Sequence, residues 1–159
     1  MKQQFVLNTP VGVLTLVAED EKLVEIHLPG KKPEEPVAEG CSPILRKAAE
    51  ELLEYFAGER RIFDLPLNPA GTLFQQRVWK ELCRIPYGQT VAYGEIARRI
   101  GSPGGARAVG QANHRNPIPV VIPCHRVIAA HGRLGGYGGG LLLKTTLLKL
   151  EGNSAFEIK

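Results

Sequence analysis

The sequence has few cysteines, few aromatic residues and no long apolar run. Its three cysteines, Cys41, Cys83 and Cys124, are an odd number without CxxC spacing, which argues against a disulfide framework and a zinc ribbon. Its apolar runs stay short of the roughly 18 to 20 residues that a membrane-spanning helix needs, and the start lacks the apolar stretch of a signal peptide. We therefore expect a soluble protein, cytoplasmic or, in a eukaryote, nuclear, with Cys41 and Cys83 buried as small apolar side chains.

Charge is divided unevenly along the chain. Residues 1–70 carry a net charge of −4 and residues 71–159 a net charge of +8, so the total of +4 conceals a polarised molecule. A basic half of this kind attracts a polyanion by counterion release, and nucleic acid is the commonest such partner. Surface lysine and arginine are also common in other proteins, so charge alone leaves the partner open.

The first part of the chain predicts a small antiparallel sheet. β-branched and apolar runs occupy residues 5–7, 11–18 and 23–28, and turn-forming residues separate them. The proline-rich and charged segment 29–40 is predicted to be a solvated loop. Residues 60–65 are a candidate for one more strand, which would extend the β structure of this part.

One helix is predicted between these runs. Ser42 is suited to be its N-cap and Pro43 its first residue, and Gly58 ends it. Its apolar residues recur at helical spacing, which predicts a core-facing stripe and not a binding surface. Residues 66–71, with two prolines and a glycine, are the best linker candidate, so we predict two domains, 1–70 and 71–159.

The second part consists mainly of helical patterns interrupted by glycine and proline. Thr72 and Gln75 have the spacing of a capping box ahead of one helix. Two further short helices, over residues 93–100 and about 104–113, are joined by Gly101-Ser102-Pro103, which is typical of a helix-turn-helix. That signal is weak alone, because short helix pairs also occur in many helical bundles.

The second helix of this pair is made mostly of small residues. Arg107 and Gln111 are its main long side chains, so it lacks the several polar readers of a sequence-specific major-groove helix. Small residues suit close approach to a backbone, which favours sequence-independent contact with DNA in the minor groove. The alternative is a glycine-rich helix pressed against its neighbours inside a core.

A cysteine lies beside a histidine after the apolar, proline-rich segment 116–123. A thiol with a pKa of about 8.5 is only a few per cent ionised at neutral pH, so a nucleophilic Cys124 needs a base. His125 is the local candidate, although adjacent side chains diverge and a bridging water would then be needed. Such a pair on its own is more often incidental than catalytic.

A longer motif surrounds this pair. Pro-Cys-His-Arg-Val occupies residues 123–127, Ala-Arg-Ala-Val-Gly (106–110) and Asn116-Pro117 precede it, and the glycine-rich run 135–141 and Glu151 follow. This pattern closely resembles the O6-alkylguanine-DNA alkyltransferases over about residues 72–152. The resemblance implies an α+β protein: a small ribonuclease-H-like N-terminal domain, with an antiparallel sheet and a helix, and a mainly helical, winged-helix-like DNA-binding domain with the helix-turn-helix.

The resemblance also implies direct reversal of DNA damage. An alkyl group on O6 of guanine in double-stranded DNA, and as a further candidate on O4 of thymine, would move irreversibly to Cys124 and consume the protein. His125 would deprotonate the thiol through water, and Glu151 would support the imidazolium. Asn116 would brace the turn that presents the cysteine, and Tyr93 would donate its hydroxyl to guanine N3.

Access to the damaged base is implied by the same resemblance. The base must leave the stack at a cost of roughly a few kcal/mol, and Arg107 would fill the vacated space. Carbonyls of Cys124 and Val127 would accept from the guanine amino group, and the amide of Gly138, where some relatives carry a hydroxyl residue, would face O6. The other substrate-binding positions are Ala106, Gly110, Gln111, Arg115 and Tyr137.

No metal and no cofactor is expected, and the protein is expected to act as a monomer. His27, His114 and His131 show no ligand spacing, and the chain lacks the N-terminal cysteines that bind zinc in some relatives. Arg126 is expected to form a structural ion pair and not a catalytic contact.

Three other functions fit parts of the pattern. A lesion-binding relative without transfer activity would carry another residue, usually tryptophan, in place of Cys124. A cysteine hydrolase using Cys124 and His125 would leave Arg107 and the helix pair unexplained. A basic DNA-binding module with a passive cysteine would perform no chemistry.

Overall fold

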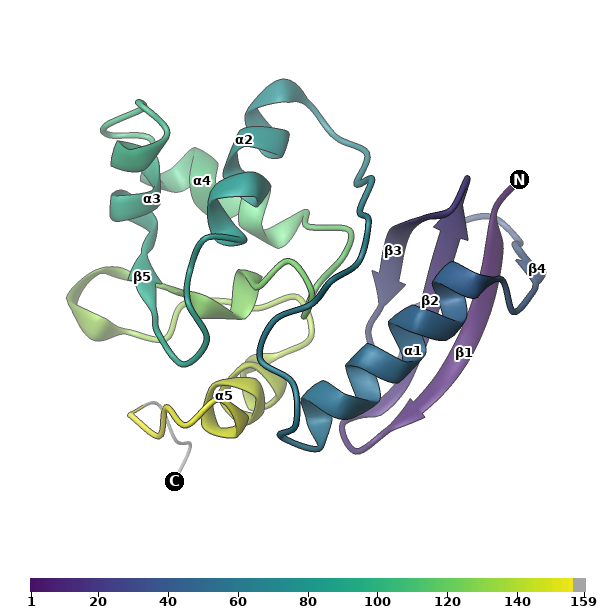
Figure 1. Ribbon diagram of the computed structural model, residues 1–159. Coiled ribbons are helices and arrows are strands. Elements are labelled where there is room, and N and C mark those ends of the chain that lie inside the picture. The colour runs from purple at the N-terminus through teal and green to yellow at the C-terminus, as the bar shows by residue number, and fades with distance from the viewer. Residues whose placement is uncertain (156–159) are drawn as a thin grey trace. The chain divides into compact units, whose positions relative to one another are not determined.

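The protein is an α+β chain, as predicted, and its computed structural model describes residues 1–155. Residues 156–159, the last four of the predicted second domain, lie outside the described residues. The chain divides into two compact units, Met1–Ala70 and Gly71–Lys159, which we call the N-terminal and C-terminal units (Figure 1).

The N-terminal unit contains a four-stranded sheet. Strands β1 (Gln3–Thr9), β2 (Gly12–Glu19) and β3 (Lys22–His27) form the predicted antiparallel meander, and β4 (Ala38–Glu39) pairs in parallel with β1, so the order is β3-β2-β1-β4. Residues Asp20-Glu21 connect β2 to β3 with φ values of 51° and 64°, the conformation of a tight hairpin turn that matches the strand twist.

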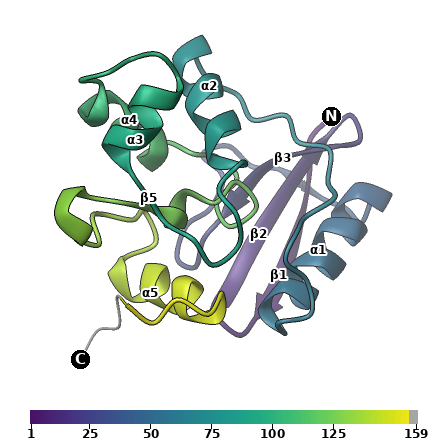
Figure 2. The same cartoon turned by 60° about the vertical axis from the view of Figure 1, so that its left-hand side comes forward.

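The predicted helix lies against one face of this sheet. Helix α1 (Pro43–Phe56) follows Ser42, and its buried side lies over β1, β2 and β3 (Figures 1 and 2). Pro43 is the first helical residue, where its missing N–H costs nothing, and Gly58 follows the helix with φ 77°. Ser42 is the N-cap residue, as predicted, although its side chain makes no capping hydrogen bond. The stripe is core, with Leu45, Ala48, Leu52 and Tyr55 fully buried.

Two details of this unit differ from the sequence predictions. Residues 60–65 form no strand, because their backbone bonds to α1: the amide of Asp64 donates to the buried Glu51 carboxylate at 2.7 Å. The segment 29–40 is not wholly a loop, since it ends in β4, and the Gly40 amide donates to the Gln4 carbonyl at 2.9 Å. In both places, partners distant in the sequence determine the backbone conformation, and local composition does not predict such partners.

The C-terminal unit begins with the predicted capping box. The Gln75 amide donates to the Thr72 hydroxyl at 3.1 Å, and the Gln75 side chain accepts from the Thr72 amide at 2.9 Å, ahead of α2 (Leu73–Leu82). Helices α3 (Tyr93–Arg99) and α4 (Ala106–His114) are the expected pair, each slightly shorter than predicted. Helix α2 packs on both, and Trp79 donates to the Ala112 carbonyl at 2.8 Å.

The rest of this unit is built from short elements. Strands β5 (Val91–Ala92) and β6 (Val127–Ile128) pair in parallel, η1 (Cys124–Arg126) and η2 (Ala130–Gly132) are single 3-10 turns, and α5 (Leu141–Leu150) packs against η1 (Figure 2). Helix α5 was not predicted from the sequence, because its leucine-rich sequence separates polar and apolar residues only weakly into two faces. Within residues 1–155 each helix is too short or too polar to cross a membrane.

Candidate active site

A rigid turn presents Cys124. Asn116 braces it from inside: its side-chain oxygen accepts from the Ile118 amide at 2.9 Å, and its amide nitrogen donates to the Ile122 carbonyl at 2.8 Å. Residues 118–127 are buried throughout, and Val120 has φ 75°, a conformation rare for a β-branched residue and typical of functional sites. Cys124 then begins η1.

The Cys124 thiol is almost completely buried, with 5% of the residue exposed. Burial raises its pKa to about 11, although hydrogen bonds from Asn116 and Tyr137 and the charge of Lys144 act in the opposite direction. The group is therefore a thiol at neutral pH, and it needs a base before it can attack.

His125, the next residue, is the candidate for that base. Its Nε2 lies 2.7 Å from Oε2 of Glu151, and both side chains are fully buried. Burial lowers the pKa of His125 although Glu151 acts to raise it, so the ring is neutral, with the Nε2 proton donated to the carboxylate. Nδ1 is buried and has no hydrogen-bond partner among the described residues, which leaves its lone pair available to accept a proton.

Glu151 receives several donors besides His125. The Arg126 guanidinium donates from Nε to Oε1 at 2.8 Å and from Nη2 to Oε2 at 3.0 Å, and the Gly88 amide donates to Oε1 at 3.1 Å. Burial opposes ionisation of Glu151, but the hydrogen bonds from His125 and Arg126 outweigh it and hold the pKa of the carboxyl well below its usual range. Arg126 thus forms the ion pair that was predicted for it.

Tyr93 belongs to the same cluster. It begins α3, and burial, together with the Cys124 charge, raises the pKa of its hydroxyl, while a hydrogen bond from Asn113 opposes that shift. A Cβ on Gly135, which has φ 73°, would lie 3.2 Å from the Tyr93 hydroxyl, and one on Gly110 would lie 3.9 Å from the ring. Glycine at 135 therefore lets the loop after η2 approach the tyrosine closely, whereas the space at Gly110 would admit a Cβ in ordinary van der Waals contact.

Lys144 is a charged residue that sequence reasoning missed. It is fully buried in α5, and its Nζ donates to the carbonyls of Val127, Leu134 and Gly136 at 2.7, 2.6 and 3.1 Å. Burial lowers its pKa to about 8, and the Cys124 charge acts to raise it. Three acceptors use all three protons of an ammonium group, so Lys144 ties the glycine-rich loop to β6. Lys144 lies three and four residues before Leu147 and Leu148, on the same face of α5. This spacing was the feature of the sequence that could have predicted its burial.

Two carbonyls predicted to bind the guanine amino group differ in what they already accept. The Cys124 carbonyl receives the Val127 amide and the Asn113 side chain, the latter at 3.3 Å, which occupies both of its lone pairs. The Val127 carbonyl receives Lys144 and is the better placed of the two for a further donor. Asn113 was also missed; it is buried on the inner face of α4.

The remaining predicted positions lie on the outside of α4 or in the glycine-rich loop. Arg107, Gln111 and Arg115 are exposed, and Ala106 is half-buried. Tyr137 and Gly138 are half-buried in the loop that Lys144 holds. Tyr137 reaches the Cys124 cluster through its hydrogen bond to the thiol. Among the described residues, no hydrogen bond or ion pair joins the side chain of Arg107 or Arg115 to that cluster.

The other cysteines take no part in the cluster. Cys41 and Cys83 are exposed, so their prediction as buried side chains is wrong: each lies at a helix terminus, where the chain meets solvent. In the described part of the chain, no group of three or more His, Cys, Asp or Glu side chains could hold a metal ion.

Family models match both units. Residues 73–153 match the model described as 6-O-methylguanine DNA methyltransferase, DNA binding domain, and residues 4–69 match its ribonuclease-like domain. The chain belongs to this family. The resemblance drawn from the Cys124 motif is thereby confirmed, including the looser resemblance of the first domain.

Relatives of the whole chain agree. The methylated-DNA--protein-cysteine methyltransferase of Mycolicibacterium paratuberculosis is 51% identical over 91% of this chain and 89% of its own length, and that of Methanosarcina acetivorans is 47% identical over 93% and 97%. The crystal structure of Mycobacterium tuberculosis OGT in complex with DNA has a TM-score of 0.85 and 46% identity, covering 95% of this chain and 92% of that one.

Proposed function

We propose that this protein repairs O6-alkylguanine in double-stranded DNA by transferring the alkyl group irreversibly to Cys124. The observation that carries the proposal is the buried Cys124 thiol beside a neutral His125 whose far nitrogen is held by Glu151 at 2.7 Å. The family and its curated relatives, all named as methyltransferases that act on methylated DNA, support the same reaction.

The proposed reaction is a displacement at the alkyl carbon. Nδ1 of His125 takes the thiol proton, directly or through a water, and the sulfur forms a bond to the carbon as the carbon–oxygen bond breaks. The electron pair of that bond stays on guanine, which takes up one proton. Tyr93 lies in the cluster as a hydroxyl donor for the charge that develops on the base, and Glu151 stabilises the imidazolium.

DNA binding is assigned to the C-terminal unit. Its net charge of +8 favours a polyanion. Arg107 and Gln111 on α4 and Arg115 just after it are exposed, and the small Ala108 beside Arg107 is exposed as well, which leaves room for close approach of a nucleic-acid backbone. A base flipped from the duplex leaves a gap that an exposed arginine can fill. The M. tuberculosis relative solved with DNA supports this partner. We also propose action as a monomer in the compartment that holds DNA.

Intact-protein mass spectrometry tests the reaction. Incubation with a duplex oligonucleotide containing O6-methylguanine should add the mass of one methylene group per chain, and peptide mapping should place it on Cys124. The exposed Cys41 and Cys83 are internal controls for nonspecific methylation. A protein that binds the lesion without gaining mass would be a lesion-binding relative without transfer activity, and repeated turnover without mass gain would indicate a hydrolase.

A further inference from the structure

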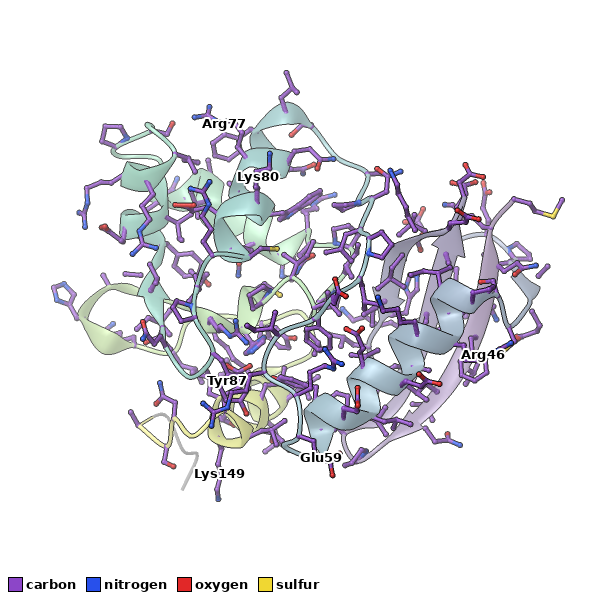
Figure 3. The ribbon with its side chains drawn as sticks, in the orientation of Figure 1. Arg46, Glu59, Arg77, Lys80, Tyr87 and Lys149 are labelled. Atoms are coloured by element: carbon purple, nitrogen blue, oxygen red, sulfur yellow. The ribbon has the colours of Figure 1, made fainter. Side chains whose placement is uncertain are left out.

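Arg126 is a buried cation that the proposed reaction does not use. Only 7% of it is exposed, and its guanidinium is fixed on three sides. It forms a bidentate pair with Glu151, donates from Nη1 to the Ile85 carbonyl at 2.7 Å, and lies 5.8 Å from the centre of the Tyr87 ring. Tyr87, labelled beside α5 in Figure 3, donates to the Leu150 carbonyl at 3.2 Å. Such anchoring orients the guanidinium toward the carboxylate.

His125 and Arg126 share one carboxylate although they are neighbours in sequence. Oε2 of Glu151 accepts from His125 at 2.7 Å and from Arg126 at 3.0 Å. The charges that act on His125 are Glu151 at the end of α5, Lys144 within α5 and Arg126 in η1. Burial lowers the pKa of His125 most, Glu151 acts to raise it, and the two cations act in the same direction as burial, so Arg126 offsets part of the effect of the carboxylate.

A carboxylate with no second partner would make a different pair with histidine. In a buried site an uncompensated negative charge within hydrogen-bond distance raises the proton affinity of the ring. The pKa of the ring would then be higher, and in the doubly protonated form Nδ1 has no lone pair for the thiol of Cys124. Glu151 alone could thus orient His125 while disabling it as a base.

We propose that Arg126 is a positioning residue that acts through Glu151 to keep the His125 imidazole neutral and able to accept the Cys124 proton. The inference rests on the proposed function for its purpose, but the protonation of His125 can be measured without DNA. Arginine suits the task better than lysine, because its planar fork binds both carboxylate oxygens at once and stays charged when buried.

The titration of His125 tests this directly. In the full chain labelled with ¹³C-histidine, the His125 signal is identified by its loss in His125→Gln, and its midpoint is compared between wild type and Arg126→Gln. Arg126→Gln keeps a hydrogen-bond donor and removes the charge, so we expect the midpoint to rise by about 1 pH unit or more. Arg126→Lys restores the charge and should return most of that shift.

The same shift should appear in the chemistry. In Arg126→Gln, the midpoint of the acid limb of the single-turnover rate against pH should rise by the same amount. At a pH below that midpoint, transfer should then be about tenfold slower than in wild type. Leu82→Ala, a fully buried position in α2, is the matched control, since it lowers stability without changing charge and should leave the midpoint in place.

An unchanged His125 midpoint in Arg126→Gln would overturn the inference and leave Arg126 as a structural ion pair. An equal shift in Leu82→Ala would overturn it too, because loosened packing would then be the cause. If Arg126→Gln does not fold, Arg126→citrulline, nearly the same shape without the charge, gives the same comparison. Absence of alkyl transfer by wild type would instead count against the proposed function, while the titration still decides the role of Arg126.

Discussion

The two units place their polar groups differently. Among the described residues, the N-terminal unit buries the polar side chains of Thr15 and Glu51, and its ion pairs, such as Lys2 with Glu25, are partly exposed. The C-terminal unit buries seven polar side chains, and they include His125, Arg126, Lys144 and Glu151. Unpaired buried charges are costly, and even paired ones add little stability. The contrast shows that one unit is built for packing and the other accepts a costly interior for chemistry.

The largest effect on the chemistry of the C-terminal unit is expected when the Cys124 sulfur is removed. Cys124→Ser should abolish alkyl transfer to the protein, since a hydroxyl is a far weaker nucleophile, while thermal unfolding changes little because the side chains have similar volume. Intact-mass analysis after incubation with O6-methylguanine duplex measures the first effect. Cys83→Ser, at an exposed position, is the control that should react as wild type does, and residual mass gain in Cys124→Ser would point to another acceptor.

Removing the carboxylate charge should affect both chemistry and stability. Glu151→Gln should slow transfer at least a hundredfold, because the imidazolium loses its support, and should cost about 3–5 kcal/mol, because Arg126 is left buried without a counter-charge. Single-turnover kinetics and urea unfolding measure the two effects.

The contribution of the ionised Glu151 carboxylate to folding stability should depend on pH. The pKa of Glu151 is depressed in the folded state, so its stabilisation is fully present above the unfolded value of about 4.3 and is lost as pH falls through the folded value. Wild type should therefore lose stability in acid more steeply than Glu151→Gln. Parallel acid profiles would mean that the carboxylate is not ionised in the fold.

Lys144 should connect the loop to the thiol. Lys144→Met keeps the length of the side chain but removes the charge that lowers the pKa of Cys124, so that pKa should rise and transfer should slow about tenfold. The rate of iodoacetamide modification against pH, in a Cys41→Ser, Cys83→Ser background, measures the pKa. Leu147→Ala, buried in the same helix, should destabilise without this shift; an equal shift there would assign the effect to packing.

Arg107 should matter for the duplex and less for the reaction itself. Arg107→Ala should slow repair of O6-methylguanine in duplex DNA by several-fold or more, because the flipped base loses the side chain that replaces it, whereas the rate with free O6-benzylguanine should stay near wild type. Lys80→Ala, which removes an exposed cation from α2, is the matched surface control in the same unit. Equal losses on both substrates would argue against a role in base extrusion.

The smallest chemical effect is expected from the N-terminal unit. Glu51→Gln removes the charge that holds the Asp64 amide and pairs with Arg60 at 3.6 Å, so it should lower the stability of that unit by about 1–2 kcal/mol. The rate with free O6-benzylguanine should be unchanged. A large change in that rate would show that the two units are not separate in function.

The elements that local sequence determines were predicted well. The meander, α1, the Thr72 capping box and the α3–α4 pair all follow from short-range rules of turns, caps and periodicity. Residues 60–65 were wrongly predicted as a strand, because a hydrogen bond to Glu51, distant in the sequence, determines their backbone. Helix α5 was missed, because it packs against η1, which is also distant in the sequence.

Of the candidate site, the residues that belong to the motif were predicted and the buried residues outside it were not. The resemblance supplied the run 123–127 and the pairing of Glu151 with His125. An ion pair was expected for Arg126, but nothing in the sequence identified the same carboxylate as its partner. Lys144 and Asn113 escaped notice because a lone lysine or asparagine in a helix is usually exposed, and only burial distinguishes these two.

The high pKa of the Cys124 thiol has a consequence for the time before any lesion is met. Peroxides and stray electrophiles attack thiolates far faster than thiols, and a group with a pKa of about 11 offers them almost none. Since each chain can accept an alkyl group once, a copy oxidised while idle is a copy lost. Burial of the sulfur thus protects an idle copy of the protein from oxidation and keeps its single acceptor intact.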